Sequence, residues 1–365
     1  MGGLGTMSAR AWKIVASFSP SWETSLVSTS GPGGLARVLE GAGGVFLIAD
    51  RSVASLHTAW LEAALGGRVL GSALIEADER LKSMSTAGGI IAEMSDSGLM
   101  REGFVVGFGG GLVCDVAALC ASLWLRGVNL VLVPTSLLCM ADACLGGKTA
   151  VNYRRARNQV GTFYPAGAVV VDTALLETLP EREVRSGLGE ILKTALVSGD
   201  AALGGLLADL AARPLPPDAA SEAVELCLRV KRDIAVGDPL EGGRRRILNL
   251  GHTFGHALES ARGFDLTHGE AVALGCIVAA RMAEALGGSP GLSVEVAGLA
   301  SSLGLPCAPG KAVRGSMSRF LGRDKKSTSE GRAWILPFGW GDCRQVLLER
   351  TRERELLGAA LEADA

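Results

Sequence analysis

The chain has 365 residues, 20% of them charged, and a formal net charge of −2 at pH 7. Its length exceeds the usual size of one domain, so we expect two domains that share a cleft. The near-neutral charge gives no sign of nucleic-acid binding, and 48% hydrophobic residues supply enough apolar surface for a globular core.

The first half of the chain alternates strand and helix patterns. The opening residues, MGGLGTMSAR, lack the apolar segment of a signal peptide, so we expect none. From Gly44 onward the expected strands are GVFLIAD, RVLGSALIEA, FVVGF, NLVLVP and AVVVD, and the expected helices cover 52–65, 81–97 and the segment after GGG. Strands separated by helices pair in parallel through right-handed crossovers. We therefore predict a doubly wound, parallel-sheet α/β domain over residues 1–180.

A long apolar stretch at 103–146 is interrupted by GFGGG, Asp115, Arg126 and Pro134. These breaks favour two buried strands with an intervening helix over a membrane span. The eight cysteines have no C-x-x-C spacing and lie mostly among apolar residues. This pattern is typical of reduced, buried thiols, and we expect a cytoplasmic protein.

Past Pro180 the strand signals nearly vanish and helical periodicity takes over. We therefore predict a mainly helical second domain over residues 181–365. The single late strand that we expect is RAWILPF at 332–338, and we expect residues 212–219 to form a loop.

A glycine triplet, Gly109, Gly110 and Gly111, stands between the strand FVVGF and the following helix. Such a turn places backbone N–H groups of a helix N-terminus where a phosphate can bind. The triplet also suits any tight strand-to-helix turn. Because it differs from G-x-G-x-x-G, an ordinary Rossmann dehydrogenase is disfavoured.

Asp142 and Lys148 lie on either side of a second glycine pair, Gly146 and Gly147. A lysine after two glycines can reach an anion that approaches the backbone closely, although a surface turn explains the same pattern. Further basic residues stand on both sides of the histidine-rich segment. They form either a solvated face or a surface that binds an anionic substrate through its phosphate, and they are Lys231, Arg244, Arg245, Arg246, Lys325 and Lys326.

Three of the four histidines, His252, His256 and His268, fall within residues 252–268. Imidazole is a common ligand of divalent transition metals, so a metal site is the first hypothesis, and hydrogen-bonded core histidines are the alternative. On a helix, His252 and His256 would share one face. The best upstream acidic ligand for zinc or iron is Glu190, in SGLGEILKTAL.

Together these motifs resemble the 3-dehydroquinate synthase family of sugar-phosphate cyclases, from about Asp50 to Pro337. The resemblance rests on GGGLVCD, the R-G of LWLRG, VPTSLL followed by D-x-x-x-GGKTAVN, and LNLGHTFGHALE with HGEAVALG. It implies a zinc (or cobalt) ion held by Glu190, His252 and His268. It also implies an NAD site formed by Asp50, Glu79, Lys82, Gly109, Gly110, Gly111, Asp115, Thr135, Ser136, Lys148, Arg157 and Thr178. The family has a lysine where this chain has Arg157.

The resemblance further implies a set of substrate-binding and catalytic residues. They are Asp142, Lys148, Asn158, Lys193, Lys231, Arg245, Asn249, His256, and Lys325 or Lys326. In the homodimer that the family forms, Arg126 would reach the phosphate site of the neighbouring subunit. The acidic run that usually precedes LNLGH is reduced here to GDPLEGG.

The family reaction converts 3-deoxy-D-arabino-heptulosonate 7-phosphate to 3-dehydroquinate and phosphate, in the shikimate route to aromatic amino acids. Three alternatives stay open on the sequence. The first is another sugar-phosphate cyclase, making 2-deoxy-scyllo-inosose or a valiolone; the second is a metal-dependent alcohol or glycerol dehydrogenase; the third is a non-catalytic binding protein. Arg245 and Asn249 favour a carboxylated substrate, and a dehydrogenase would leave the basic residues unused.

Overall fold

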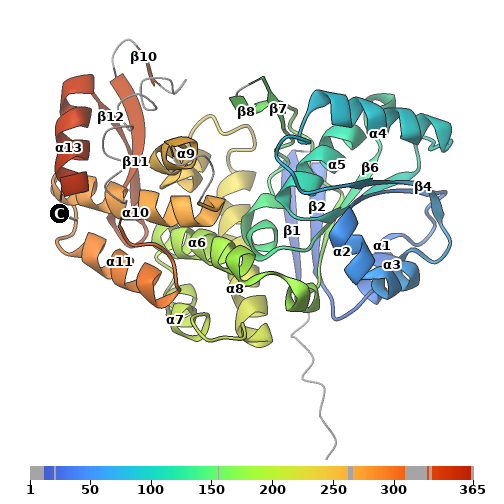
Figure 1. Cartoon of the computed structure of the whole chain (residues 1–365), viewed down its shortest axis with the longest axis horizontal. Coiled ribbons are helices and arrows are strands. Elements are labelled where there is room, and N and C mark those ends of the chain that lie inside the picture. Colours follow the sequence, from blue (N-terminus) through green and yellow to red (C-terminus); the bar gives the residue numbers. More distant parts are fainter. Residues whose placement is uncertain are drawn as a thin grey trace, which may run out of the picture. The chain divides into compact units, whose positions relative to one another are not determined.

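A computed structural model describes residues 12–19, 22–154, 156–261, 266–308, 327–328 and 331–362. The chain divides into two compact units (Figure 1). One unit takes the residues up to Leu179 together with Ala220–Leu240, and the other takes Pro180–Ala219 and the residues from Glu241 onward. The single domain boundary predicted near residue 180 stays a prediction. It differs from this division because it places residues 220–240 in the second domain.

The first unit is built on a seven-stranded sheet in the order β1-β2-β9-β6-β5-β3-β4. The strands are β1 (Lys13–Ser19), β2 (Trp22–Ser28), β3 (Val45–Asp50), β4 (Val69–Ile75), β5 (Phe104–Gly109), β6 (Asn129–Pro134) and β9 (Ala168–Val171). All neighbouring strands pair in parallel except β1 and β2, which form an antiparallel pair at one edge. Every residue of β3 is buried, as expected of a strand covered on both faces.

Helices cover the two faces of this sheet, with α4 and α5 on one face and α1 to α3 on the other (Figure 1). Their bounds are α1 (Gly33–Val38), α2 (Arg51–Leu56), α3 (Thr58–Leu65), α4 (Met84–Asp96) and α5 (Gly111–Leu123). The predicted doubly wound α/β fold is therefore confirmed. The continuous helix predicted over 52–65 was wrong, because the backbone breaks at His57 with φ −117° and ψ 30°. A short hairpin, β7 (Val151–Tyr153) and β8 (Ala156–Val160), completes the unit together with most of α8 (Pro217–Val236).

The second unit is mainly helical, as predicted. Its helices are α6 (Glu181–Ser198), α7 (Ala201–Asp209), α9 (His252–Ala261), α10 (His268–Glu284), α11 (Leu292–Ser302) and α13 (Arg350–Glu362). The central helix is α10, which packs against α6, α9, α11 and α13 (Figure 1). Because α8 starts at Pro217, the loop predicted over 212–219 was wrong at its end.

An antiparallel sheet of β10 (Ser327–Thr328), β11 (Gly331–Gly339) and β12 (Asp342–Leu348) also belongs to the second unit. The strand predicted at 332–338 corresponds to β11. Strand β12 was not predicted, because most of its residues are exposed or half-buried and do not form a long apolar run.

In the part of the chain that the structure describes, no helix is long and apolar enough to cross a membrane. All eight cysteines are free thiols, and six of them are buried.

Candidate active site

Two close backbone contacts, both made by glycines of α10, bring this helix unusually near to α6 and to the start of α9. A Cβ atom on Gly269 would lie 1.7 Å from the carbonyl oxygen of Ser186 in α6, and one on Gly275 would lie 2.0 Å from the carbonyl oxygen of Gly251. Only glycine fits at such distances. Because Gly269 follows His268 and Gly251 precedes His252, these contacts bring two histidines toward α6.

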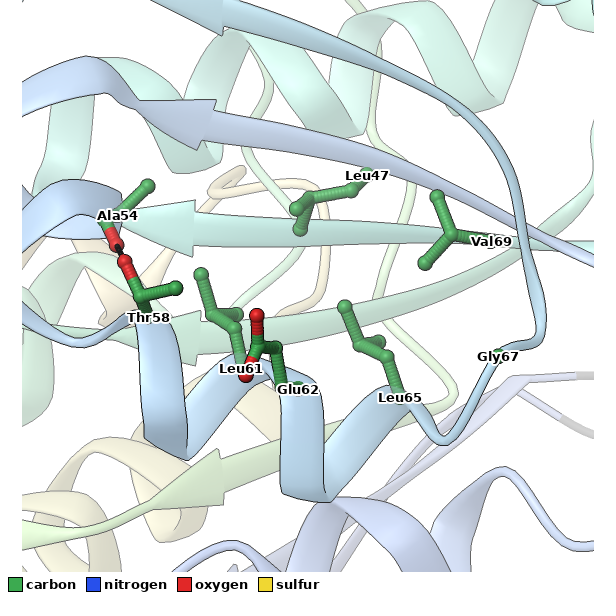
Figure 2. Close-up of a pocket in the computed structure, with 8 residues that line it drawn as sticks. All are labelled: Leu47, Ala54, Thr58, Leu61, Glu62, Leu65, Gly67 and Val69. Atoms are coloured by element: carbon green, nitrogen blue, oxygen red, sulfur yellow. Dashed lines mark hydrogen bonds between the residues drawn. The ribbon is translucent and has the colours of Figure 1, made fainter.

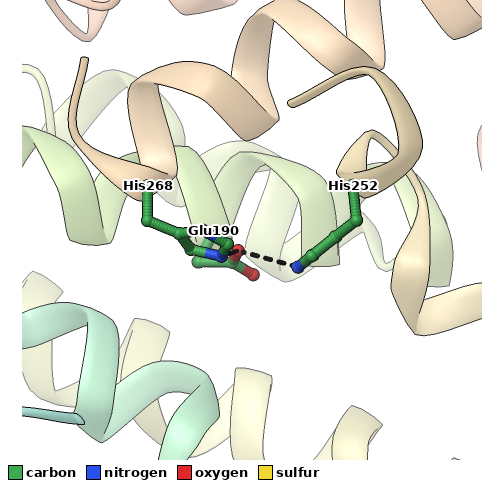
Figure 3. Close-up of side chains that lie close together, drawn as sticks. All are labelled: Glu190, His252 and His268. Carbon is green, nitrogen blue, oxygen red and sulfur yellow. Dashed lines mark ion pairs between the residues drawn. The ribbon is translucent and has the colours of Figure 1, made fainter. Parts of the chain in front are cut away.

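Glu190, His252 and His268 consequently converge, each from a different helix (Figure 3). The Oε1 atom of Glu190 lies 3.7 Å from Nε2 of His252 and 3.3 Å from Nε2 of His268. One ligand atom from each residue lies within 4.8 Å of the other two. The three side chains predicted to hold a metal are therefore near enough to share one cation.

The Glu190 carboxylate is fully buried, and Nζ of Lys193, one turn later in α6, lies 2.5 Å from its Oε2. Burial alone would raise the pKa of Glu190, but Lys193 and the two imidazoles outweigh this effect and hold the pKa well below its usual range. Neither carboxylate oxygen accepts a well-directed hydrogen bond from the described residues. An ionised, buried carboxylate in this state suits a divalent cation.

The ring of His252 has the tautomer that a metal ligand needs. Its Nδ1 lies 3.1 Å from the carbonyl oxygen of Leu250, and since a carbonyl can only accept, Nδ1 carries the proton and Nε2 keeps its lone pair toward Glu190. Burial, opposed by Glu190 and aided by Lys193, sets the pKa of His252 well below 6.5. The imidazole is therefore neutral at physiological pH and able to bind a metal through Nε2.

His268 stands between two carboxylates. Its Nε2 faces Glu190 and its Nδ1 lies 3.8 Å from Oε2 of Glu259, a buried residue of α9. Burial alone would lower the pKa of His268, but Glu190 and Glu259 raise it to about 9. A carboxylate behind a ligating histidine orients the ring and makes it more basic. Glu259 was not predicted as a site residue, although its position three residues after His256 places it on the same face of the helix.

The start of α10 is fixed by a reciprocal capping arrangement. The Thr267 hydroxyl accepts a hydrogen bond from the Glu270 backbone N–H at 3.4 Å, and Oε2 of Glu270 accepts one from the Thr267 N–H at 2.8 Å. The backbone of His268 is thus held at the first turn of the helix. This T-x-x-E pattern is visible in the sequence as THGE.

His256 lies next to the other two histidines but is exposed at the surface of α9. Its ring centroid is 5.4 Å from that of His252 and 5.9 Å from that of His268. His256, Glu259 and His268 form a second group whose ligand atoms lie within 4.8 Å of one another. The more buried group with Glu190 is the better metal site, because its carboxylate is ionised and fully enclosed.

Two further predicted site residues of the second unit are buried or engaged. Arg245 is 1% exposed, and the side-chain amide of Asn249 donates a hydrogen bond to Oε1 of Glu241. Glu241, which the sequence analysis did not single out, has a left-handed backbone with φ 59°. Lys325 and Lys326 lie outside the described residues.

In the first unit the glycine triplet lies at the carboxyl end of β5, where α5 begins. Gly110 is the N-cap of α5 and supplies no side-chain hydrogen bond, so the first-turn N–H groups stay available to a ligand. A Cβ on Gly109 would come within 2.8 Å of Val113, so glycine is required there. The sheet order reverses between β3 and β5, which is where doubly wound sheets bind ligands.

Other predicted nucleotide residues have structural partners at this end of the sheet. Oδ1 of Asp50 caps α2 by accepting from the N–H groups of Ser52 and Val53, at 2.8 and 3.0 Å. Thr135 is buried, and Oγ of Ser136 accepts a hydrogen bond from the N–H of Cys139 at 3.3 Å. The Thr178 hydroxyl lies 2.8 Å from Nε2 of His57.

Lys82 is a buried ammonium group that joins two predicted sites. Its Nζ donates to Oδ2 of Asp115 and to Oδ1 of Asn158, both at 2.6 Å. Burial raises the pKa of Asp115, and the neighbouring Lys82 opposes this shift. Nη2 of Arg157 lies 3.4 Å from Oε1 of Glu79.

The remaining predicted residues of the first unit are Asp142, Lys231, Lys148 and Arg126. Nζ of Lys231 lies 2.8 Å from Oδ1 of Asp142 and also donates to its carbonyl oxygen at 2.6 Å. Lys148 is exposed and follows Gly147, whose φ is +69°. Arg126 is exposed in a left-handed turn with φ 64°.

A cavity of about 330 Å³ in the first unit contains none of the predicted site residues (Figure 2). Leu47, Leu61, Leu65 and Val69 supply much of its wall, and Glu62 is its one charged lining residue. It lacks the basic groups that a phosphorylated ligand requires, so it is not the expected site.

Comparison with known proteins finds relatives over most of the chain. Residues 72–186 match the family model for 3-dehydroquinate synthase N-terminal, and residues 187–327 match the one for 3-dehydroquinate synthase C-terminal. The 3-dehydroquinate synthase of Pelobacter propionicus is 38% identical over 327 residues, covering 88% of this chain and 90% of that protein. The 3-dehydroquinate synthase of Xanthomonas axonopodis pv. citri is 42% identical over 253 residues, covering 66% and 68%.

Solved structures share the fold. ValA, the 2-epi-5-epi-valiolone synthase of Streptomyces hygroscopicus subsp. jinggangensis, solved with NAD+ and Zn2+ bound, has a TM-score of 0.81 at 29% identity over 97% of this chain and 100% of that one. A 2-deoxy-scyllo-inosose synthase, complexed with carbaglucose-6-phosphate, NAD+ and Co2+, has a TM-score of 0.85 at 24% identity, over 95% and 99%. A probable glycerol dehydrogenase from Sinorhizobium meliloti is less similar, with a TM-score of 0.62 at 17% identity, over 93% and 96%.

Proposed function

Because this chain belongs to the 3-dehydroquinate synthase family, we propose that it converts 3-deoxy-D-arabino-heptulosonate 7-phosphate to 3-dehydroquinate and phosphate. The observation that carries the proposal is the convergence of Glu190, His252 and His268 in a chain that matches the family over residues 72–327. The reaction is a net elimination and cyclisation, so the enzyme is a carbon–oxygen lyase that uses NAD without consuming it.

Glu190, His252 and His268 would hold a divalent metal, zinc or cobalt. The ionised carboxylate of Glu190, the free Nε2 of His252 and the orienting carboxylate behind His268 fit such an ion. Gly110 and the first turn of α5 would bind the pyrophosphate of NAD, with the other predicted nucleotide residues around it. When bound, NAD would accept a hydride from the carbon that bears a substrate hydroxyl and later return it, and the metal would increase the acidity of that hydroxyl.

The basic residues would bind the substrate and hold its charge. Lys148 and Asn158 would bind the phosphate through charge-assisted and neutral hydrogen bonds, and they would stabilise it as it leaves. Arg245 and Asn249 would bind the substrate carboxylate, which distinguishes the heptulosonate from an uncharged sugar. Lys193 would keep Glu190 ionised and donate to a substrate hydroxyl.

His256 would move a proton during the elimination, because its imidazole is exposed beside His252 and an imidazole can accept a proton on one nitrogen and donate one from the other. Asp142 would fix the ammonium group of Lys231 in position for the substrate. We also propose a homodimer, in which Arg126 completes the phosphate site of the other subunit, and a cytoplasmic location, supported by the eight free thiols.

The test is the identity of the product. Purified protein loaded with zinc and NAD is incubated separately with the heptulosonate 7-phosphate and with glucose 6-phosphate, which lacks the carboxylate. We expect 3-dehydroquinate, identified by NMR, from the first and no carbocycle from the second. A carbocyclic product from glucose 6-phosphate alone would instead assign the chain to the inosose type of cyclase.

A further inference from the structure

Asn152, in β7, is hydrogen-bonded to two segments that the proposed function assigns to different ligands. Its side-chain Nδ2 donates to the carbonyl oxygen and to Oε2 of Glu79, at 3.0 and 2.8 Å. Its Oδ1 accepts from the backbone N–H of Asn158 at 3.0 Å, and its own N–H donates to the carbonyl oxygen of Lys82 at 2.8 Å. Both polar ends of the Asn152 side chain are thus engaged, one by each segment.

The bond from Asn152 supports an uncommon backbone conformation at Asn158. Asn158 has φ 49°, in the left-handed region, which asparagine tolerates better than most residues. In this conformation its Oδ1 accepts a hydrogen bond from Nζ of Lys82, which is 5% exposed. The orientation of the Asn158 side chain therefore depends on where Asn152 holds its backbone.

We propose that Asn152 is a positioning residue that couples NAD binding at Glu79–Lys82 to the binding of the substrate phosphate at Asn158. The inference rests on the proposed function, which assigns these two segments to their ligands. Ordering of the nucleotide segment by NAD is transmitted through the Asn152 amide to the backbone of Asn158, and the phosphate acts in the reverse direction. Because such coupling is reciprocal, each ligand raises the affinity for the other by the same factor.

The experiment measures the Kd of NAD by calorimetry on zinc-loaded protein, with and without a phosphonate analogue of the heptulosonate 7-phosphate. The analogue has a methylene group in place of the ester oxygen, so elimination is blocked. In the unsubstituted protein we expect the analogue to tighten NAD binding by about 5-fold or more, in the range typical of coupled sites. Asn152→Ala should bring this ratio close to one and leave one zinc ion bound per chain.

Exchanging the amide and carboxylate groups of Asn152 and Glu79 distinguishes a positioning role of Asn152 from a general loss of structure. Asn152→Asp keeps the acceptor for Asn158 but places a carboxylate against the carboxylate of Glu79, so the ratio should fall. Adding Glu79→Gln restores a donor and acceptor pair, with the new amide at position 79 donating to the new carboxylate at position 152. The ratio of NAD Kd values without and with the phosphonate should then recover in part. A matched control is Asn129→Ala, at the amino end of β6, where the side-chain amide likewise donates two hydrogen bonds, in this case to the carbonyl oxygens of Glu102 and Gly103.

Three outcomes would overturn the inference. They are an unchanged ratio in Asn152→Ala, the same loss in Asn129→Ala, or two ligands that bind the unsubstituted protein independently. If the unsubstituted protein binds neither NAD nor the phosphonate, the proposed function fails and the inference falls with it.

Discussion

Gly189 and Gly269 are so close that a Cβ atom on Gly189 would lie 2.2 Å from the carbonyl oxygen of Gly269. Each of these glycines is the chain neighbour of a proposed metal ligand, Glu190 in one case and His268 in the other. The absence of two side chains therefore sets the distance between α6 and α10 at the level of the metal site. Gly189 and Gly269 thus allow the close packing of α6 and α10 that brings the proposed metal ligands together.

Replacement of Gly269 by alanine tests this relationship. The new methyl group would collide with the backbone of Ser186, so α10 must move away from α6 and carry His268 with it. Overpacking of this kind costs about 1–3 kcal/mol of unfolding free energy, measured by urea denaturation, and zinc affinity should fall by at least tenfold. Gly298→Ala in α11 is the control, since a Cβ there meets nothing within 4 Å. If Gly269→Ala and Gly298→Ala had the same unfolding free energy and the same zinc affinity, close packing at Gly269 could not be what positions His268.

Metal binding and turnover should separate in two variants. His268→Ala removes a proposed ligand and should lose both zinc and activity. Lys148→Ala removes a proposed phosphate contact and should keep one zinc ion while losing most activity. Zinc content is measured by atomic emission on dialysed protein. Zinc at full occupancy in His268→Ala would remove His268 from the ligand set.

Zinc binding should release a proton. In the metal-free protein the pKa of His268 is raised to about 9, so the ring is charged at pH 7.5, whereas His252 is neutral and Glu190 ionised. Zinc needs a neutral nitrogen, so about one proton leaves per ion, and affinity rises about tenfold per pH unit between pH 7 and 8. Calorimetry in buffers of different ionisation enthalpy counts the protons. An affinity independent of pH would contradict the assigned charge of His268.

Lys82→Met should destabilise the first unit. The substitution leaves Asp115 beside a buried apolar chain without its ammonium partner, a change that costs roughly 3 kcal/mol in comparable buried pairs. Burial raises the pKa of Asp115, and loss of Lys82 raises it further. When the pKa of a carboxyl group is higher in the folded state, the folded state binds more protons than the unfolded state does. The decrease in unfolding free energy caused by Lys82→Met should therefore be larger at pH 8 than at pH 5. Urea denaturation at both pH values measures this decrease in unfolding free energy. An equal decrease at the two pH values would contradict the assigned interaction between Lys82 and Asp115.

Local sequence patterns predicted most of the first unit but not its edge. Buried strands such as β3 and β6 are continuous apolar runs, which indicate their structure directly. The β1–β2 hairpin was missed, because its two strands, KIVASFS and WETSLVS, are not continuous apolar runs like β3 and β6. The break at His57 was missed because residues 52–65 keep a helical apolar pattern across it.

The residues of the candidate site were predicted one by one from the family motifs. Some residues that contact them were not predicted. Glu259 lies beside His268, and Asn152 is hydrogen-bonded to Glu79 and to the backbone of Asn158. Their contacts arise only after the helices and the hairpin have packed. Spacing along the chain therefore predicts candidate ligands more readily than the groups that contact them.

The most direct test of the account follows phosphate release and NADH absorbance in the same reaction of the zinc-loaded protein with NAD and the heptulosonate 7-phosphate. The account predicts continuous release of phosphate with no net accumulation of NADH, because the hydride returns to the substrate within each turnover. Accumulation of NADH without phosphate release would contradict it and indicate a metal-dependent dehydrogenase.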